Sequence, residues 1–248
     1  MRRLLDNSLV GWLRNFIRPP KDKQLDLSRR SLIAAGLAGL GGGLLFDVHP
    51  QASARTFSPA LIRPPGSVGE EEFRNRCIRC GECMKVCPTN AINPALFEAG
   101  LEGLWSPVMN MNLGYCEYEC TLCTQVCPTD AIVELSLEEK TETKIGMAFI
   151  DKNRCLPYAS ARSCIVCEEH CPTPEKAIWF EEVEVLNELG EMVLLKRPRV
   201  NPDLCIGCGI CQNKCPFMDR PAIYVTSAGE TRNPDNQVLL SQDSTGFY

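Results

Sequence analysis

Histidine is almost absent from this chain of 248 residues, which has only His49 and His170. Neither lies at a ligand spacing from the cysteines, which weakens any zinc site that mixes cysteine with histidine. The sequence also has no HExxH motif, no nucleophile elbow and no dinucleotide or flavin fingerprint. We therefore expect no independent catalytic site and no substrate site of the protein's own.

Aromatic residues are scarce too, at 7%, and basic residues do not dominate. Residues 1–54 hold eight of the 26 Lys and Arg and four of the 31 Asp and Glu, so the remainder has a net charge of −9. Nucleic-acid binding needs a basic footprint and is therefore not expected. Sixteen cysteines and eighteen prolines instead predict a compact, loop-rich body, whose folding free energy comes partly from bound metal.

All sixteen cysteines belong to four sets of four, and each set ends in Cys-Pro. Sets one and four match the C-x2-C-x2-C-x3-C-P run that binds 4Fe–4S clusters in bacterial ferredoxins. Sets two and three have longer gaps but keep four cysteines each, so we expect four 4Fe–4S clusters with all sixteen cysteines as ligands. The sets are Cys77, Cys80, Cys83 and Cys87 (set one); Cys116, Cys120, Cys123 and Cys127 (set two); Cys155, Cys164, Cys167 and Cys171 (set three); and Cys205, Cys208, Cys211 and Cys215 (set four).

Two other uses of the cysteines fit this pattern less well. Closely spaced cysteines, repeated four times, are badly placed for disulfide geometry. Structural zinc sites use two separated Cys-x-x-Cys pairs, often with histidine. Three close thiolates with a more distant fourth are instead typical of the corners of an iron–sulfur cube.

The sets are expected to work in pairs, because in two-cluster ferredoxins the fourth cysteine binds the other cluster. Residues 132–137 and 145–151 alternate like strands around a turn at 138–143, which predicts a hairpin between sets two and three. We therefore expect a crossed pairing. Its ligand groups are Cys116, Cys120 and Cys123 with Cys171; Cys155, Cys164 and Cys167 with Cys127; Cys77, Cys80 and Cys83 with Cys215; and Cys205, Cys208 and Cys211 with Cys87. A second predicted hairpin, residues 178–186 with 192–195, keeps the tandem pairing of set one with two and three with four open.

The front of the chain has the features of an export signal. Arg29 and Arg30 precede an apolar stretch rich in alanine and glycine at 32–46, and residues 52–54 form a small-x-small cleavage site. Paired arginines indicate the twin-arginine route, which exports folded proteins. We expect the clusters to be built in the cytoplasm, the twin-arginine translocase to export the folded protein, and the protein to reside on the periplasmic side of the inner membrane.

Removal of the signal stays open. The apolar stretch of fifteen residues spans about 22 Å as a helix, short of the roughly 20 residues that cross a bilayer. Residues 2–18 predict a basic amphipathic helix that can lie on an anionic membrane surface, and a long signal n-region without a role of its own is the alternative. The balance favours cleavage, with retention as an anchor as the other outcome.

We divide the chain into four parts. Residues 1–54 are the signal, 55–69 a polar linker, 70–228 a four-cluster ferredoxin-like domain and 229–248 a polar tail. The tail lacks periodicity, so we expect a mobile or partner-wrapped arm. The expected fold class is α+β, built from tandem bacterial-ferredoxin-like modules of βαβ or hairpin units with many loops.

A short Ala-Ile phrase follows each set, and the sets recur at roughly 40–50 residues, which indicates an internal repeat. The phrase stands at residues 91–92, 131–132, 177–178 and 222–223, and a short strand is expected to begin at each. The link between sets one and two, residues 93–114, is interrupted by proline and glycine and does not predict a hairpin.

The chain resembles the family of NapG, the ferredoxin-type subunit associated with periplasmic nitrate reductase, and of its methylamine-utilisation relative MauM. It departs from that family in the long basic N-terminus, the polar tail and the insertion at residues 117–119. The resemblance rests on the twin-arginine signal, the four cysteine sets, Cys77-Ile78-Arg79-Cys80-Gly81, the stretched Cys155-Leu156-Pro157-Tyr158 before Cys164 and Cys167, and Cys171-Pro172 before Lys176-Ala177-Ile178.

This resemblance implies an electron-transfer subunit of a membrane-associated respiratory oxidoreductase complex. Its partners would be an integral-membrane quinone-reactive or cytochrome subunit and an extracytoplasmic redox protein. A maturation factor that supplies clusters or electrons to a client enzyme is the alternative. Four fully ligated sites weigh against that alternative, because a donor needs clusters that are easily released.

Overall fold

In the computed structural model of the chain, the structure describes residues 58–186, 190–217, 219–233 and 235–236. The chain divides into two compact units, Met1–Ala52 and Ser53–Tyr248, and every described residue belongs to the second. The predicted signal and amphipathic helix at 1–54 therefore lie outside the described residues, as do residues 237–248 of the predicted tail. Within the described ranges, no helix is both long and apolar enough to cross a bilayer.

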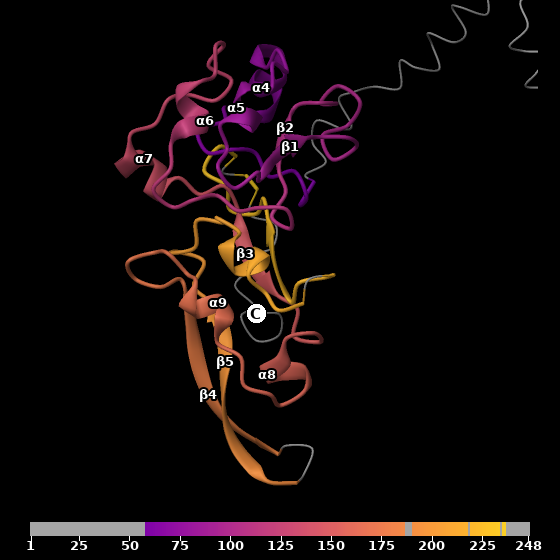
Figure 1. Cartoon of the computed structure of the whole chain (residues 1–248), viewed down its shortest axis with the longest axis vertical. Coiled ribbons are helices and arrows are strands. Elements are labelled where there is room, and N and C mark those ends of the chain that lie inside the picture. The colour runs from indigo at the N-terminus through magenta and orange to yellow at the C-terminus, as the bar shows by residue number, and fades with distance from the viewer. Residues whose placement is uncertain (1–57, 187–189, 218, 234, 237–248) are drawn as a thin grey trace, which may run out of the picture. The chain divides into compact units, whose positions relative to one another are not determined.

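The second unit consists of short helices and antiparallel strands joined by loops (Figure 1). The helices are α4 (Glu70–Arg76), α5 (Glu82–Lys85), α6 (Leu122–Gln125), α7 (Leu137–Glu142), α8 (Leu156–Ala159), α9 (Val166–Glu169) and α10 (Ile210–Asn213). The strands are β1 (Ile92–Pro94), β2 (Pro107–Met109), β3 (Met147–Ile150), β4 (Ile178–Leu186), β5 (Met192–Val200) and β6 (Ile223–Thr226).

The strands pair in a pattern that occurs twice. β1 after set one pairs with β2 before set two, and β4 after set three pairs with β5 before set four. β3 before set three pairs with β6 after set four, and the matching contact in the first half is a single bridge between Ser67 and Ile132. Each half therefore closes on itself, and the strands join set one to set two and set three to set four.

The repeated Ala-Ile phrase produces this pattern. All four alanines are buried, and each alanine carbonyl accepts a backbone N–H from the strand opposite. The donors are Asn110 to Ala91 at 2.7 Å, Val68 to Ala131 at 3.1 Å, Asn201 to Ala177 at 2.7 Å and Asp151 to Ala222 at 2.7 Å. The prediction that the phrase begins a strand is confirmed at β1, β4 and β6, and the second phrase forms the bridge at Ile132.

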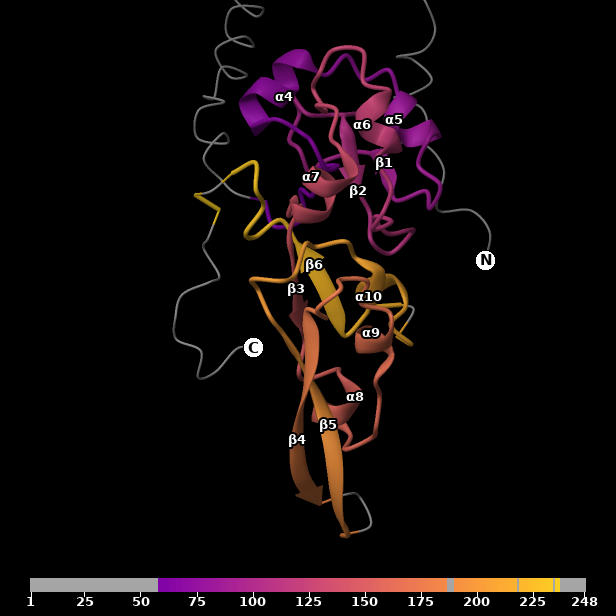
Figure 2. The same cartoon turned by 90° about the vertical axis from the view of Figure 1, so that its left-hand side faces the viewer.

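The two halves are ferredoxin-like modules, which confirms the predicted fold class. Module one (residues 58–133) contains sets one and two, and its short helices α5 and α6 contact each other. Module two (residues 145–228) contains sets three and four, with α9 against α10. Figure 2 shows the long ribbon of β4 and β5 in module two. Proline cannot continue the helices, so Cys-Pro ends each ligand loop and returns the chain to its strand.

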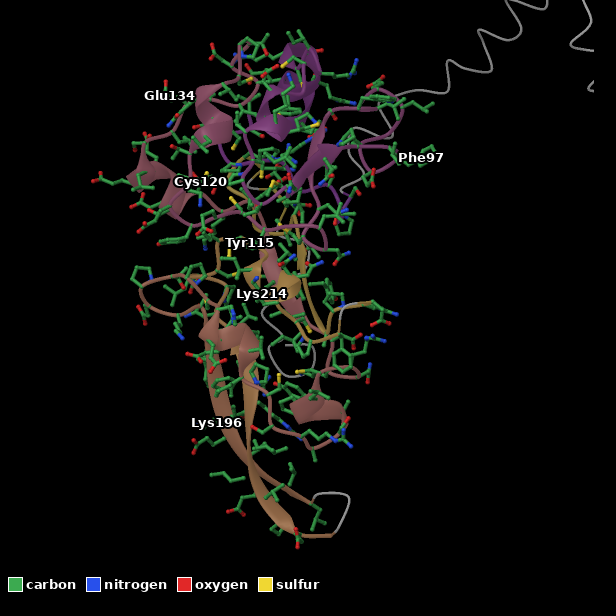
Figure 3. All side chains as sticks on the ribbon, in the orientation of Figure 1. Phe97, Tyr115, Cys120, Glu134, Lys196 and Lys214 are labelled. Atoms are coloured by element: carbon green, nitrogen blue, oxygen red, sulfur yellow. The ribbon has the colours of Figure 1, made fainter. Side chains whose placement is uncertain are left out.

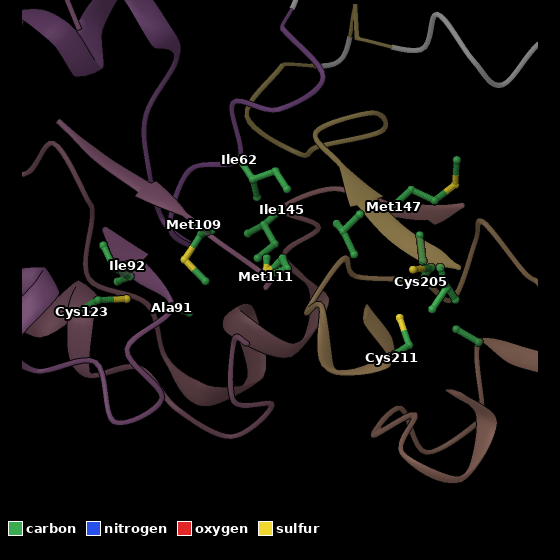
Figure 4. Close-up of a cluster of buried hydrophobic side chains, with 14 of the residues drawn as sticks. Ile62, Ala91, Ile92, Met109, Met111, Cys123, Ile145, Met147, Cys205 and Cys211 are labelled. Atoms are coloured by element: carbon green, nitrogen blue, oxygen red, sulfur yellow. The ribbon is translucent and has the colours of Figure 1, made fainter. Parts of the chain in front are cut away.

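One apolar core runs through both modules. It combines small and medium side chains with the cysteines themselves, including Ile62, Met109 and Cys123 of module one and Met147 and Cys205 of module two (Figure 4). Large aromatic side chains contribute little, as the 7% aromatic content implies. The core is therefore thin, and the metal–thiolate bonds are expected to supply much of the folding free energy.

The predicted hairpin between sets two and three is wrong. Residues 137–142 form the helix α7 where a turn was expected, and β3 pairs with β6 instead of residues 132–137. A capping box starts α7: the Ser136 hydroxyl accepts the backbone N–H of Glu139 at 3.2 Å, and the Glu139 carboxylate accepts the N–H of Ser136 at 2.8 Å. The Ser-x-x-Glu signal was in the sequence, but the alternating apolar residues obscured it.

The predictions for the other two links, between sets three and four and between sets one and two, had different outcomes. The predicted hairpin between sets three and four is confirmed, and β5 continues to Val200, beyond the expected end at residue 195. Residues 93–114 were not expected to form a hairpin, yet β1 and β2 pair antiparallel in this link. Only three residue pairs make that ladder, so its apolar alternation is too short to stand out in the sequence.

The expected linker is also wrong where the structure describes it, at residues 58–69. Arg63 has a fully buried side chain and donates to Ser106 Oγ at 2.8 Å and to the Pro107 carbonyl at 2.7 Å. Its guanidinium pairs with Glu70 of α4 and lies 4.5 Å from the centre of the Phe73 ring. This segment is thus a structural part of module one.

The described residues of the expected tail, 229–233 and 235–236, include a further partner of Glu70. Arg232 donates to Glu70 and to Glu230, both at 2.7 Å, and Asn236 is buried. Burial raises the pKa of Glu70, but Arg63 and Arg232 outweigh it, so the pKa lies below its ordinary value. The Glu70 carboxylate therefore links Arg63, near the start of the described residues, to Arg232, near their end.

Substitution of a crowded ligand-loop glycine should destabilise the protein more than substitution of an open one. Gly207 and Gly81 both have left-handed backbones, with φ of +74° and +78°. A Cβ on Gly81 meets nothing within 4 Å, whereas one on Gly207 would lie 2.5 Å from the backbone of Gly146. We expect Gly81→Ala to cost about 1–2 kcal/mol from backbone strain, and Gly207→Ala clearly more. Anaerobic thermal unfolding of the cluster-loaded proteins measures this, and equal melting temperatures for the two variants would contradict it.

Candidate iron–sulfur cluster sites

Each cysteine set forms a loop that ends in a single helical turn. The third cysteine of the set lies on α5, α6, α9 or α10. Gly81 and Gly209 precede α5 and α10 with the same backbone angles, φ 78° and ψ 3°, a conformation that glycine adopts without strain. Sets one and four, which share the regular spacing, therefore also share their local geometry.

Sets three and four bring their cysteines together around two cavities. Four cysteines line the first cavity with apolar neighbours such as Ile150 and Phe217: Cys155, Cys164, Cys167 and Cys215. Four cysteines line the second, with neighbours such as Ile206 and Val225: Cys171, Cys205, Cys208 and Cys211. Each cavity thus receives three thiols from one set and the fourth thiol from the other set of the same module.

Sets one and two exchange their fourth cysteine in the same way. The thiol of Cys83 interacts electrostatically with Cys77, Cys80 and Cys127. The thiol of Cys123 interacts with Cys116 and Cys120 of its own set, and with Cys87 and Cys83 of set one. Cys116 also interacts with Cys87. Set one therefore takes Cys127, and set two takes Cys87.

The expected crossed pairing is wrong, and the structure has the tandem pairing. It rested on a hairpin between sets two and three that does not form, and the strands β1 to β6 close each module separately. We name four ligand groups. Group A is Cys77, Cys80, Cys83 and Cys127; group B is Cys116, Cys120, Cys123 and Cys87; group C is Cys205, Cys208, Cys211 and Cys171; and group D is Cys155, Cys164, Cys167 and Cys215.

One signal in the sequence distinguishes the two pairings. The step from the fourth cysteine to the Ala-Ile phrase is short and identical in sets one and two, Cys-Pro-Thr-Asn-Ala and Cys-Pro-Thr-Asp-Ala, and longer in sets three and four. Asn90 and Asp130 hold equivalent left-handed positions, with φ of 56° and 53°. Related turns thus occur within one module, which is the relation that the tandem pairing requires.

Burial makes the thiols poor acids without metal. Burial, together with the neighbouring thiols, raises the pKa of Cys83, Cys155, Cys167 and Cys208 to about 12. Iron binds the thiolate and displaces the proton. Cluster binding therefore offsets the cost of placing many ionisable thiols in an apolar interior, because the iron neutralises the thiolate charge.

The sulfur atom of each fourth cysteine has a hydrogen-bond partner close to it in the sequence. Thr89, Thr129 and Thr173 place a hydroxyl at 3.5, 3.8 and 3.4 Å from Cys87, Cys127 and Cys171, and the N–H of Ala222 donates to Cys215 at 3.3 Å. At Cys87 and Cys127, burial raises the pKa but these and other backbone bonds outweigh it, so the pKa is lowered. Hydrogen bonds to sulfur also tune the reduction potential of a cluster.

The donor set fits an iron–sulfur cube better than the alternatives. All sixteen cysteines are free of disulfides. In the part of the chain that the structure describes, no three His, Cys, Asp or Glu side chains are arranged to hold a single metal ion, as a zinc site would require. Four thiols spread around an apolar cavity match a cluster in which each iron binds one thiolate.

The four groups lie in single file, and their order in space differs from that of the sets in the sequence. Cys83 of group A interacts electrostatically with Cys123 of group B, and Cys167 of group D interacts in the same way with Cys211 of group C. Between the modules, the N–H of Cys116 in group B donates to the carbonyl of Cys208 in group C at 2.8 Å. The order is therefore A, B, C, D, with set four ahead of set three.

The junction of groups B and C is well packed. Ile206 and Ile210 of module two lie against Tyr115 and Tyr118 of module one. The ammonium of Lys214 lies 5.4 Å from the centre of the Tyr115 ring (Figure 3). Such contacts exclude water and fix the spacing between the two inner groups, whereas Cys80 of the outer group A is exposed to solvent.

Two domain families match this chain. The 4Fe-4S dicluster domain matches residues 76–131, and the 4Fe-4S binding domain matches residues 198–218. The first match covers sets one and two together, in agreement with the tandem pairing. No solved structure matches the chain.

Several proteins of known name are similar over most of the chain. Ferredoxin-type protein NapG of Escherichia coli is 34% identical over 77% of this chain and 80% of its own length. NapG of Haemophilus influenzae is 32% identical over 84% of this chain and 72% of its own length. Methylamine utilization ferredoxin-type protein MauM of Methylorubrum extorquens is 30% identical over 86% of this chain and 97% of its own length.

Removal of one fourth cysteine should identify the set that depends on it. In Cys215→Ala we expect iron to fall from about sixteen to about twelve atoms per chain, because group D loses a ligand. Iodoacetamide should then label Cys155, Cys164 and Cys167, with the sites read by mass spectrometry. Labelling of Cys77, Cys80 and Cys83 instead would restore the crossed pairing. Cys87→Ala is the matched variant in module one and should expose the remaining thiols of group B.

Proposed function

Because the chain belongs to the NapG/MauM family of ferredoxin-type proteins, we propose a specific role for it as an iron–sulfur electron carrier. It relays electrons through its four 4Fe–4S clusters within a membrane-associated respiratory oxidoreductase complex. One partner is an integral-membrane quinone-reactive or cytochrome subunit, and the other is an extracytoplasmic redox protein. The sixteen cysteines of groups A to D are the proposed ligands.

The single-file order of the ligand groups is the observation that carries this proposal. Electrostatic interactions between thiols link group A to group B and group C to group D, and the backbone hydrogen bond described above links groups B and C. A protein that stores or senses electrons has no need of such a chain, whereas a relay between two partners does. Groups B and C meet at the junction of the modules, so groups A and D, at the two ends of the order, are the proposed points of exchange.

The same geometry supports a carrier without a substrate site. The two cavities lined by module two are themselves cluster sites, with four cysteines around each. Carriers of this family are typically non-catalytic, so the chemistry on a quinone or a terminal acceptor falls to the partners. The exposed Cys80 of group A supports exchange with a partner that docks at that end.

The maturation-factor alternative has less support. All four cysteines of group C are at least partly buried, three of them deeply, and release of that cluster would require module two to open. A donor of clusters needs a site that gives up its cluster without unfolding. Mixing the loaded protein with an apo-ferredoxin separates the two functions, because transfer of iron would favour the alternative.

Loss of the cluster at one end of the row should stop electron transfer between the partners, while the other three clusters stay bound. We expect the isolated, cluster-loaded protein to leave a quinol unoxidised, and to be reduced by it when membrane vesicles of the native host are added. In Cys215→Ala, the three remaining clusters should still change redox state, while electron flow from vesicles to a periplasmic acceptor fraction falls to background. Absorbance bleaching and acceptor reduction are the readouts. Quinol oxidation by the isolated protein, or an undiminished flow in the variant, would refute the proposal.

We also propose that the protein acts on the periplasmic side of the inner membrane after twin-arginine export. The paired arginines and the apolar stretch of residues 32–46 support this. Fusion of residues 1–60 to a reporter should send the reporter to the periplasm, and Arg29→Lys with Arg30→Lys should keep it in the cytoplasm. The same double substitution in the whole chain should leave cluster loading unchanged. Export that survives both substitutions would exclude this route.

A further inference from the structure

Lys140 is a charged side chain that the fold alone does not explain. It lies on α7, between the two modules, and is only 1% exposed. Its Nζ donates to the carbonyl oxygens of Glu117 and Tyr118, both at 2.6 Å, and lies 5.5 Å from the centre of the Tyr118 ring. In the described residues, no carboxylate forms an ion pair with it.

A buried ammonium without a counter-charge is strongly destabilising, since carbonyl oxygens and an aromatic face solvate the charge but do not neutralise it. A side chain as long as lysine usually extends its charge to water. At this position it instead turns inward and binds the backbone of the ligand loop of set two. The placement therefore indicates a negative partner that is present when the protein is complete.

Group B supplies that partner. Glu117 and Tyr118 belong to the extra residues between Cys116 and Cys120. The ammonium is therefore bound to the two residues that follow the first cysteine of the group. Burial raises the pKa of the Cys116 thiol to about 11, and the ammonium of Lys140 opposes that rise. A 4Fe–4S cluster with four thiolates carries net negative charge, since the thiolates outweigh the positive charge of the iron–sulfur core.

We propose that Lys140 is the fixed counter-ion of the cluster bound by group B and raises the reduction potential of that cluster. The proposal rests on the ligand assignment above. One-electron reduction adds a negative charge to the cluster, and a nearby positive charge stabilises the reduced form more than the oxidised form. Electrostatic influence of this kind is a recognised means of setting cluster potentials.

The position of Lys140 gives this charge a role in the route of the electrons. It acts on Cys116, whose N–H donates to the carbonyl of Cys208 in group C, so it lies at a backbone hydrogen bond that joins the two inner groups. Lys144 also acts on group C through Cys205, but it is exposed enough for solvent to screen its charge. The exposed carboxylate of Glu117 opposes Lys140 and is screened in the same way. Lys214, which lies at the same junction, is exposed as well, so Lys140 is the charge that solvent screens least.

A redox titration of charge-matched variants tests this inference. Lys140→Met keeps the length of the side chain and removes its charge, and Lys140→Arg keeps the charge. Lys196→Met removes an exposed lysine of β5 that pairs with Glu182 at 3.8 Å and is the control. The cluster-loaded proteins are titrated anaerobically with dithionite, and EPR spectra give the midpoint potential of each cluster. Iron analysis counts the clusters independently.

We expect one of four midpoint potentials to become more negative in Lys140→Met, and all four to stay unchanged in Lys140→Arg and Lys196→Met. If the apolar variant loses one cluster, retention of it in Lys140→Arg still supports the requirement for charge. Four unchanged potentials in Lys140→Met, or loss of the cluster from both Lys140 variants, would leave only a packing role and overturn the proposal. A wild-type protein without about sixteen iron atoms would instead refute the cluster assignment itself.

Discussion

The exchange of the fourth cysteine between neighbouring sets is the constraint on which the rest of this structure depends. Cys127 completes group A and Cys87 completes group B, so neither set can form its site alone. The chain must return after each Cys-Pro to lie beside the other loop, and the buried alanine of each Ala-Ile phrase makes that return with one backbone hydrogen bond. The strand pairing and the metal sites thus both depend on the return of the chain to the neighbouring ligand loop.

This constraint explains how a chain with few aromatic residues keeps a defined interior. Many of the thiols occupy core positions, and burial raises the pKa of thiols such as those of Cys123 and Cys211. Bound clusters convert those positions into covalent cross-links between loops. The Arg63–Glu70–Arg232 network adds a second link, between the first residues of module one and the segment that follows module two.

Sequence reasoning reached the cluster count and the repeated Ala-Ile strands, because ligand spacing and a buried small residue are local properties. It failed where the outcome depended on competition between patterns. At Ser136 and Glu139, a capping box outweighed an apparent strand alternation and produced α7, and the crossed pairing fell with the hairpin. Residues 58–69 looked polar and proline-rich, yet Arg63 finds its partners at Glu70, Ser106 and Pro107. A burial that depends on distant partners leaves no periodic signal in the sequence.

The helix that replaced the expected hairpin also has a consequence for the electron route. A hairpin would have held sets two and three together, whereas α7 carries the chain past group B and lets β3 begin beside set four through the bond between Ile145 and Ile206. Group C consequently meets group B, and group D moves to the far end. The same helix brings Lys140 behind Cys116. One short segment therefore sets both the order of the ligand groups and the charge at the point where the two modules meet.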